Sequence, residues 1–122
     1  MHEFSTMQNI ISVVIEEAKK MGAKKVIKVT LEVGELTFLA DEQMKFAFNL
    51  LKERTIVEDA ELDIKRIKAK IKCKCGYEGE IRYGEKDEFH IIFPIISCPI
   101  CGNEAKILEG RECRIRSMEV DI

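Results

Sequence analysis

The chain has 122 residues, of which 46% are hydrophobic, so it can form one domain with a modest core or a small domain with a metal-stabilised appendage. Its 20 basic and 22 acidic residues give a formal net charge of -2, which argues against general affinity for nucleic acid or anionic membranes. The longest apolar stretch, residues 91–96, contains Pro94 and is too short to cross a bilayer. Because the N-terminus also lacks a secretion signal, we expect a cytoplasmic protein.

The N-terminal segment combines a predicted helix with a group of nitrogen atoms. Ser5 begins a capping-box pattern, apolar residues then recur at helical spacing, and Gly22 is expected to stop the helix. The segment Met1-His2-Glu3 should therefore lie immediately before the helix. Its terminal amine, first amides and imidazole could hold a small metal ion, and Glu3 could bind that ion, tune the imidazole or cap the helix. A histidine also occurs at position 2 by chance, so the segment alone is a weak signal.

A strand, a helix and a second strand are predicted next. Apolar residues alternate with polar ones over residues 27–34, which predicts a half-buried strand. Asp41 is expected to cap the second helix. Residues 60–71 alternate again, but the phase changes at Arg66-Ile67, which suggests a β-bulge. Six apolar residues of the second helix are expected to face the core: Met44, Phe46, Ala47, Phe48, Leu50 and Leu51.

Five cysteines in a chain without a secretion signal favour metal binding over disulfides. Four of them form two tight pairs, Cys73-Lys74-Cys75 and Cys98-Pro99-Ile100-Cys101, and a glycine follows each pair. Two such turns can supply the four thiolates of a tetrahedral zinc site, and the glycines permit the positive φ that turns amides toward sulfur. A closed site of this kind leaves no open coordination position, so we expect the zinc to be structural.

Three alternatives to the four-cysteine site are open. Cys113 or His90 could replace one of the ligands, or the pairs could have a redox function. Cys113 lies in an alternating stretch and is expected to be a buried strand residue. Neither pair follows the strand of a βαβ unit, which argues against a thioredoxin-like site.

The order of these elements predicts an α+β fold with an insertion. Residues 77–83 and 89–96 resemble two strands around a polar turn, which is typical of a zinc-ribbon hairpin. The tail after residue 112 alternates as well, and a lone C-terminal strand needs a sheet to join. We therefore expect a small sheet with two helices in residues 1–71 and 108–122, and a zinc-ribbon lobe in residues 72–107.

Basic residues alternate from Lys65 to Lys74, on one face of the predicted strand. A solvated face with acidic neighbours is the simplest interpretation, and a zinc-ribbon adaptor that binds protein or nucleic acid through the face from Lys68 to Lys74 is the alternative function. No glycine-rich phosphate loop is present, and both halves of the zinc deaminase signature are incomplete. We therefore expect that the protein is not an enzyme.

Several motifs follow one another over the whole chain: Met1-His2-Glu3, residues 31–36 (LEVGEL), residues 46–48 (FAF), the two cysteine pairs, Gly110-Arg111-Glu112 and Ser117-Met118-Glu119-Val120. In this order they resemble the HypA family, whose members are nickel metallochaperones for the maturation of NiFe-hydrogenases. The resemblance implies a nickel-binding domain with Met1, His2 and Glu3, and a structural zinc held by Cys73, Cys75, Cys98 and Cys101. It also implies two partners, a HypB-type GTPase and the hydrogenase large subunit, and no catalysed reaction.

The chemistry of the N-terminus agrees with nickel as the ion. An amine, deprotonated amides and an imidazole form chelate rings that suit planar Ni(II), whereas Zn(II) prefers a tetrahedron. His90 is the only other histidine and could complete the nickel site, although partial burial in the hairpin is the simpler interpretation. A homodimer is left open.

Overall fold

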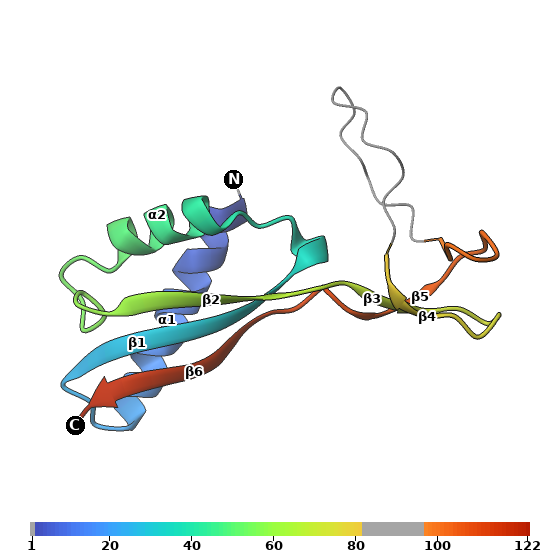
Figure 1. The fold of residues 1–122 in the computed structure, drawn as a ribbon. Helices are drawn as coiled ribbons and strands as arrows, with labels where there is room; N and C mark the ends of the chain where they lie inside the picture. The colour runs from blue at the N-terminus through green and yellow to red at the C-terminus, as the bar shows by residue number, and fades with distance from the viewer. Residues whose placement is uncertain (1, 82–96) are drawn as a thin grey trace.

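The computed structural model describes residues 2–81 and 97–122. These residues form two small sheets at opposite ends of an elongated molecule, and both α-helices lie at one end (Figure 1), which confirms the α+β class. None of the helices in this part of the chain has the length and apolar character needed to cross a bilayer. In chain order the elements are α1 (His2–Lys20), β1 (Lys25–Gly34), the short 3-10 helix η1 (Glu35–Thr37), α2 (Asp41–Leu51), β2 (Glu61–Ile67), β3 (Lys70–Lys72), β4 (Glu78–Glu80), β5 (Lys106–Glu109) and β6 (Cys113–Asp121).

The larger sheet has the strand order β2-β1-β6. β1 is parallel to β2, with α2 in the connection between them, and antiparallel to β6. The C-terminal strand thus joins the N-terminal part of the chain, as expected. α1 crosses one face of this sheet and packs against α2 (Figure 1). Fifteen buried residues fill the core between these elements: Met7, Ile10, Ile11, Val14, Ala18, Val26, Val29, Leu31, Val33, Leu39, Met44, Ala47, Phe48, Val57 and Ala60.

The first helix begins earlier than its capping signal predicts. α1 includes His2 and Glu3, so the prediction that these two residues precede the helix is wrong. Ser5 is not a cap: its hydroxyl lies within the first turn and donates to the carbonyl of His2, at 3.2 Å. Gly22 does end the helix, with a φ of +71° that suits glycine, and its amide bonds back to Lys19.

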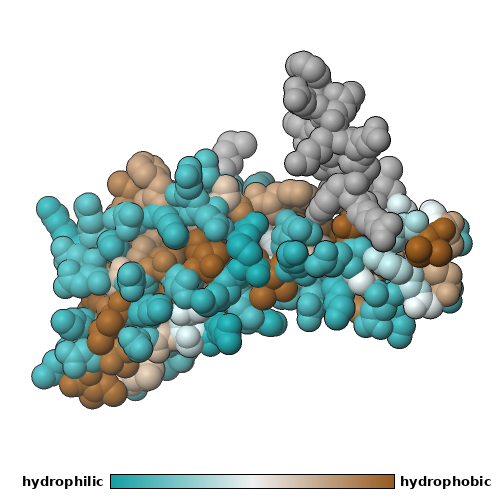
Figure 2. Space-filling model, in the orientation of Figure 1, coloured by the Kyte–Doolittle hydropathy of each residue, from teal (hydrophilic) through white to brown (hydrophobic). Residues whose placement is uncertain are grey.

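Three apolar residues that were expected to face the core lie on the surface. A bulge between Val26 and Lys28 shifts the phase of β1, so Val26 is buried and Ile27 is 43% exposed. On α2, Phe46 and Leu50 point away from the buried stripe, and hydrophobic side chains gather over this helix in Figure 2. Asp41 is the first helical residue of α2, and Ala40 occupies the N-cap position. The expectation that Asp41 caps this helix is therefore wrong.

The predicted strand over residues 60–71 is two strands. β2 ends at Ile67 in the larger sheet, and β3 begins at Lys70 in a second sheet of order β4-β3-β5. The phase change therefore marks a passage between sheets and not a bulge. A small second core lies there: Ala69, Ile71, Cys73, Ile81, Cys98 and Ala105. The domain bounds expected from the sequence stay a prediction.

The two sheets meet where two glycines touch. A Cβ at Gly34 would collide with the backbone carbonyl of Gly110, whose own φ of +117° favours glycine. The amide of Leu36 donates to the carbonyl of Gly110 at 2.7 Å, and the amide of Ala69 donates to the carboxylate of Glu35 at 3.3 Å. η1 is thereby bound to both chain segments that lead into the second sheet.

Candidate metal centres

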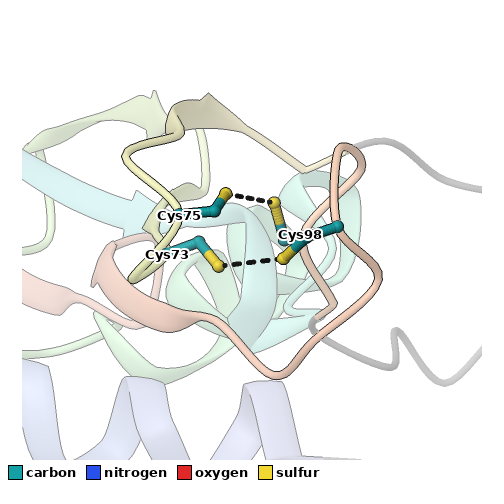
Figure 3. A group of neighbouring side chains, drawn as sticks. Cys73, Cys75 and Cys98 are labelled. Atoms are coloured by element: carbon teal, nitrogen blue, oxygen red, sulfur yellow. Dashed lines mark hydrogen bonds between the residues drawn. The ribbon is translucent and has the colours of Figure 1, made fainter.

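The four predicted zinc ligands converge in the second lobe. The sulfur atoms of Cys73, Cys75, Cys98 and Cys101 all lie within 4.8 Å of one another. Each sulfur of the first cysteine pair faces a sulfur of the second pair (Figure 3). The sulfurs of Cys73 and Cys101 are 3.4 Å apart, and those of Cys75 and Cys98 are 3.6 Å apart. These distances are far longer than a disulfide bond of about 2.05 Å, so all four are free thiols.

Two glycine turns bring the sulfurs into place. Gly76 and Gly102 have φ values of +100° and +75°, and their amides donate to the carbonyls of Cys73 and Cys98 at 3.0 and 2.9 Å. In the second turn the amide of Ile100 points at the sulfur of Cys98, at 3.4 Å. The turns therefore aim both sulfurs and backbone donors at one point, and the single residue between Cys73 and Cys75 does not prevent it.

The electrostatics of the cluster favour a thiolate at Cys98. Burial opposes its ionisation, but the backbone amides of Cys101 and Ile100 outweigh that effect and lower the pKa of the Cys98 thiol to about 7. The backbone amide of Asn103 favours the thiolate of Cys101, but the hydrogen bonds to Cys73 and Cys98 together with burial outweigh it, so the pKa of Cys101 is raised. Without a cation the four thiols cannot all ionise, whereas a bound dication would stabilise every thiolate.

The donor set and its dimensions fit zinc. A regular tetrahedron with Zn–S bonds of about 2.3 Å has sulfur–sulfur edges of about 3.8 Å, close to the distances in the cluster. Four sulfurs fill all four coordination positions, so the site is structural and closed to substrate. Cys113 lies in β6, outside the cluster, and the expectation that it is buried is wrong, because it is the first residue of an edge strand.

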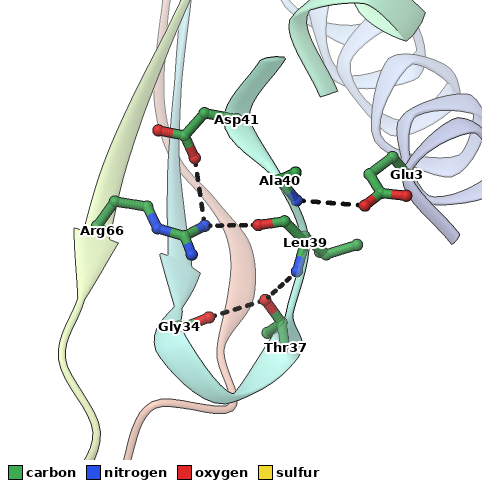
Figure 4. A network of polar contacts seen from close by, with 7 residues as sticks. All are labelled: Glu3, Gly34, Thr37, Leu39, Ala40, Asp41 and Arg66. Carbon is green, nitrogen blue, oxygen red and sulfur yellow. Dashed lines mark hydrogen bonds and ion pairs between the residues drawn. The ribbon is translucent and has the colours of Figure 1, made fainter. Parts of the chain in front are cut away.

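The predicted nickel residues lie at the other end of the molecule. The side chain of His2 is exposed in the first turn of α1. The side chain of Glu3 is half-buried and turns toward the start of α2, where its Oε2 accepts a hydrogen bond from the amide of Ala40 at 3.2 Å (Figure 4).

Glu3 is strongly held as a carboxylate. The N-terminal ammonium, the backbone amide of Glu3 itself and the amide of Ala40 together lower the pKa of its side chain from 4.5 to about 2. A permanent negative charge beside the terminal amine and His2 favours a cation there.

Two predictions about other residues have different outcomes. His90 lies outside the described residues, as does the second expected strand of the hairpin, residues 89–96. The basic stretch is divided between the two sheets, and acidic partners accompany it: Lys65 pairs with Asp63 at 3.3 Å, and Lys68 with Glu80 at 3.5 Å. These pairs agree with a solvated face that has acidic neighbours, and the adaptor function is not favoured.

The sequence gives no signal for the residues that surround Glu3. Ala40 takes part through its backbone amide, which any residue except proline offers. Arg66 approaches the same corner from β2, 27 residues along the chain from Leu39, and only the correct alignment of β1 with β2 could have placed it there.

Comparison with known proteins gives consistent matches. A family model described as "Hydrogenase/urease nickel incorporation, metallochaperone, hypA" matches residues 1–120. The hydrogenase maturation factor HypA of Methanothermobacter thermautotrophicus is 39% identical over 122 residues, which cover 99% of this chain and 98% of that protein. HypA of Methanocaldococcus jannaschii is 39% identical over 128 residues, with coverage of 99% and 98%.

Solved structures resemble the whole chain as well. The solution structure of the Ni metallochaperone HypA from Helicobacter pylori superposes with a TM-score of 0.66 at 26% identity, covering 98% of this chain and 97% of that one. A second solution structure of a HypA protein gives a TM-score of 0.68 at 28% identity, with coverage of 98% and 96%. Both ends of the molecule thus have counterparts of the same fold.

Proposed function

The chain belongs to the HypA family of nickel-incorporation metallochaperones, and from this premise we propose that it holds Ni(II) at its N-terminus. The donors are the terminal amine of Met1, the first backbone amides, and the imidazole of His2. Glu3 adds a negative charge next to them. The four-cysteine cluster fits a structural zinc, which when bound would fix the shape of the second lobe.

The observation that carries this proposal is the exposed first turn of α1. The side chain of His2 is exposed there, next in sequence to the carboxylate of Glu3, and His2 is the only histidine among the described residues. Chelate rings through an amine, an amide and an imidazole suit the planar geometry of Ni(II). The zinc site, by contrast, has no position left for a second ion.

The direct test is a nickel titration of zinc-loaded protein with a native N-terminus. We expect roughly one Ni(II) per chain, and we expect His2→Ala to abolish this binding while zinc content and circular dichroism stay unchanged. His90→Ala tests separately whether the other histidine of the sequence takes part in nickel binding. Equal nickel affinity in His2→Ala and the parent protein would sink the proposal.

The pH dependence of the titration is a second part of this test. Amide and imidazole nitrogens must lose protons when they bind nickel, so affinity should fall as the pH is lowered and protons should be released on loading. A nickel affinity that does not change between pH 8 and pH 6, values chosen on either side of the ordinary imidazole pKa of about 6.5, would contradict nitrogen ligands.

We further propose that a HypB-type GTPase and the hydrogenase large subunit are the partners of this protein, in the cytoplasm. The support is the name of its relatives, which are hydrogenase maturation factors. No catalytic step is needed for such a carrier. Nickel transfer to a purified hydrogenase precursor, measured with and without the GTPase, tests both partners.

The two sheets and their separate cores support a division of the chain into two domains. We propose residues 1–71 with 108–122 for the nickel-binding domain and residues 72–107 for the zinc-ribbon domain, with β3 and β5 at the boundary. Limited proteolysis after zinc removal tests this division, because cleavage should then concentrate in residues 72–107.

A further inference from the structure

The loop before α2 contacts the N-terminal turn of α1 through Glu3. Ala40 is the N-cap residue of α2, and this end of the helix has no side-chain cap hydrogen bond. Its amide donates instead to Glu3 of α1, 37 residues away in the chain. In a capping box, a glutamate at the third position of the same helix accepts a hydrogen bond from the N-cap amide. Here Glu3, a residue of α1, accepts the bond from the N-cap amide of α2 instead.

A second contact fixes the position of that amide. Nη1 of Arg66, at the end of β2, donates to the carbonyl of Leu39 at 3.0 Å and forms an ion pair with Oδ1 of Asp41 at 3.3 Å (Figure 4). Leu39 and Asp41 flank Ala40 on either side. Oδ1 of Asp41 is buried and has no hydrogen bond, so the ion pair with Arg66 serves this oxygen, while 45% of the Asp41 side chain is exposed to solvent.

The other side of the loop is fixed by its own residues. The hydroxyl of Thr37 donates to the carbonyl of Gly34 at 2.7 Å and accepts from the amide of Leu39 at 3.2 Å. The turn from β1 is therefore closed locally, whereas Arg66 is the link that ties its far end to β2. A planar guanidinium suits this task, because its donors can serve a carbonyl and a carboxylate together.

We propose that Arg66 is a positioning residue for nickel: by holding Leu39 and Asp41 it places the amide of Ala40 where Glu3 is anchored, and so orders the N-terminal ligands before the ion arrives. This inference rests on the proposed nickel site. Arg66 does not touch the ion, and its effect passes through Glu3. Ordered ligands lose less conformational freedom on binding, which raises affinity.

The test is a double-mutant cycle of nickel affinity. Arg66→Ala should weaken binding about threefold to tenfold, the size expected for loss of one ordinary hydrogen bond, and Arg66→Lys should restore part of it. In a Glu3→Ala background the same Arg66→Ala change should have almost no further effect, because the connection is already broken. Arg114→Ala is the matched control, since Arg114 pairs with Glu32 at 2.9 Å on the larger sheet, in β6.

Structural readouts accompany each variant. Zinc content and circular dichroism should be those of the parent protein, and the amide resonance of Ala40 should shift in both Arg66→Ala and Glu3→Ala. Two results would overturn the inference. One is a loss of nickel affinity in Arg66→Ala that is no larger than the loss in Arg114→Ala. The other is an Arg66→Ala effect on nickel affinity that is the same whether position 3 is Glu or Ala. Unchanged nickel binding in His2→Ala would instead refute the nickel site itself, so the two failures are distinguishable.

Discussion

Removal of zinc should unfold the second lobe and leave the rest of the molecule folded. The second core contains six buried residues, of which only Ile71 and Ile81 are large, whereas the first core contains fifteen. A structural zinc contributes about 10–16 kcal/mol in small zinc peptides. The net stability of a whole domain is about 5–15 kcal/mol. So small a core cannot replace the metal, and the lobe should lose its structure with it.

The assay is amide hydrogen exchange measured before and after chelation. In zinc-loaded protein, the amides of Ile71 and Ile107 in the second sheet should be protected. After chelation, or in Cys98→Ser, this protection should vanish, while Val29 and Leu31 of β1 stay protected. Cys113→Ser is the matched control, because this thiol lies outside the cluster and its loss should leave zinc binding intact.

Two results would refute this reasoning. Persistent protection of β3 and β5 without metal would show that the second core is sufficient by itself. Loss of protection in β1 as well would show that the two lobes unfold as one unit.

Other predictions concern the junction, the helix face and the terminus. Gly34→Ala should destabilise the junction, seen as a lower melting temperature, because its Cβ meets the carbonyl of Gly110; an unchanged melting temperature counts against that close approach. Phe48→Ala should cost about 3–5 kcal/mol in denaturant unfolding, and Phe46→Ala, at a position 67% exposed, close to nothing; equal costs would contradict the assigned face. Glu3→Gln should reduce the loss of stability that occurs between pH 4.5 and about 2. The carboxyl pKa of Glu3 is lower in the folded protein than in the unfolded chain, so the ionised carboxylate stabilises the fold above pH 4.5 and this stabilisation is lost as the pH falls to about 2. An identical acid unfolding profile in the variant would argue against the Ala40 contact.

Local patterns predict this protein well where the chain obeys local rules. Alternation identifies β1 and β6, Gly22 marks the end of α1, and the spacing of the cysteines identifies all four members of the cluster. Each of these signals depends on a few neighbouring residues and on a metal with fixed geometry.

The errors occur where distant segments decide the conformation. The capping signal at Ser5 is overridden because α1 continues to its contact with Ala40, and Ile27 is exposed because a bulge forms against β6. The break after Ile67 depends on the passage between two sheets, which alternation cannot distinguish from a bulge. The approach of Arg66 to Leu39 likewise requires the strand alignment of the finished fold.

The most direct test of the nickel assignment is to block the terminal amine without changing any side chain. Zinc-loaded protein with a free amine at Met1 should bind about one Ni(II), and the same chain acetylated at that nitrogen should lose this binding while its zinc and fold are retained, because an acetylated amine is no longer a donor. Equal nickel affinity in the two forms would contradict the account and place the ion elsewhere.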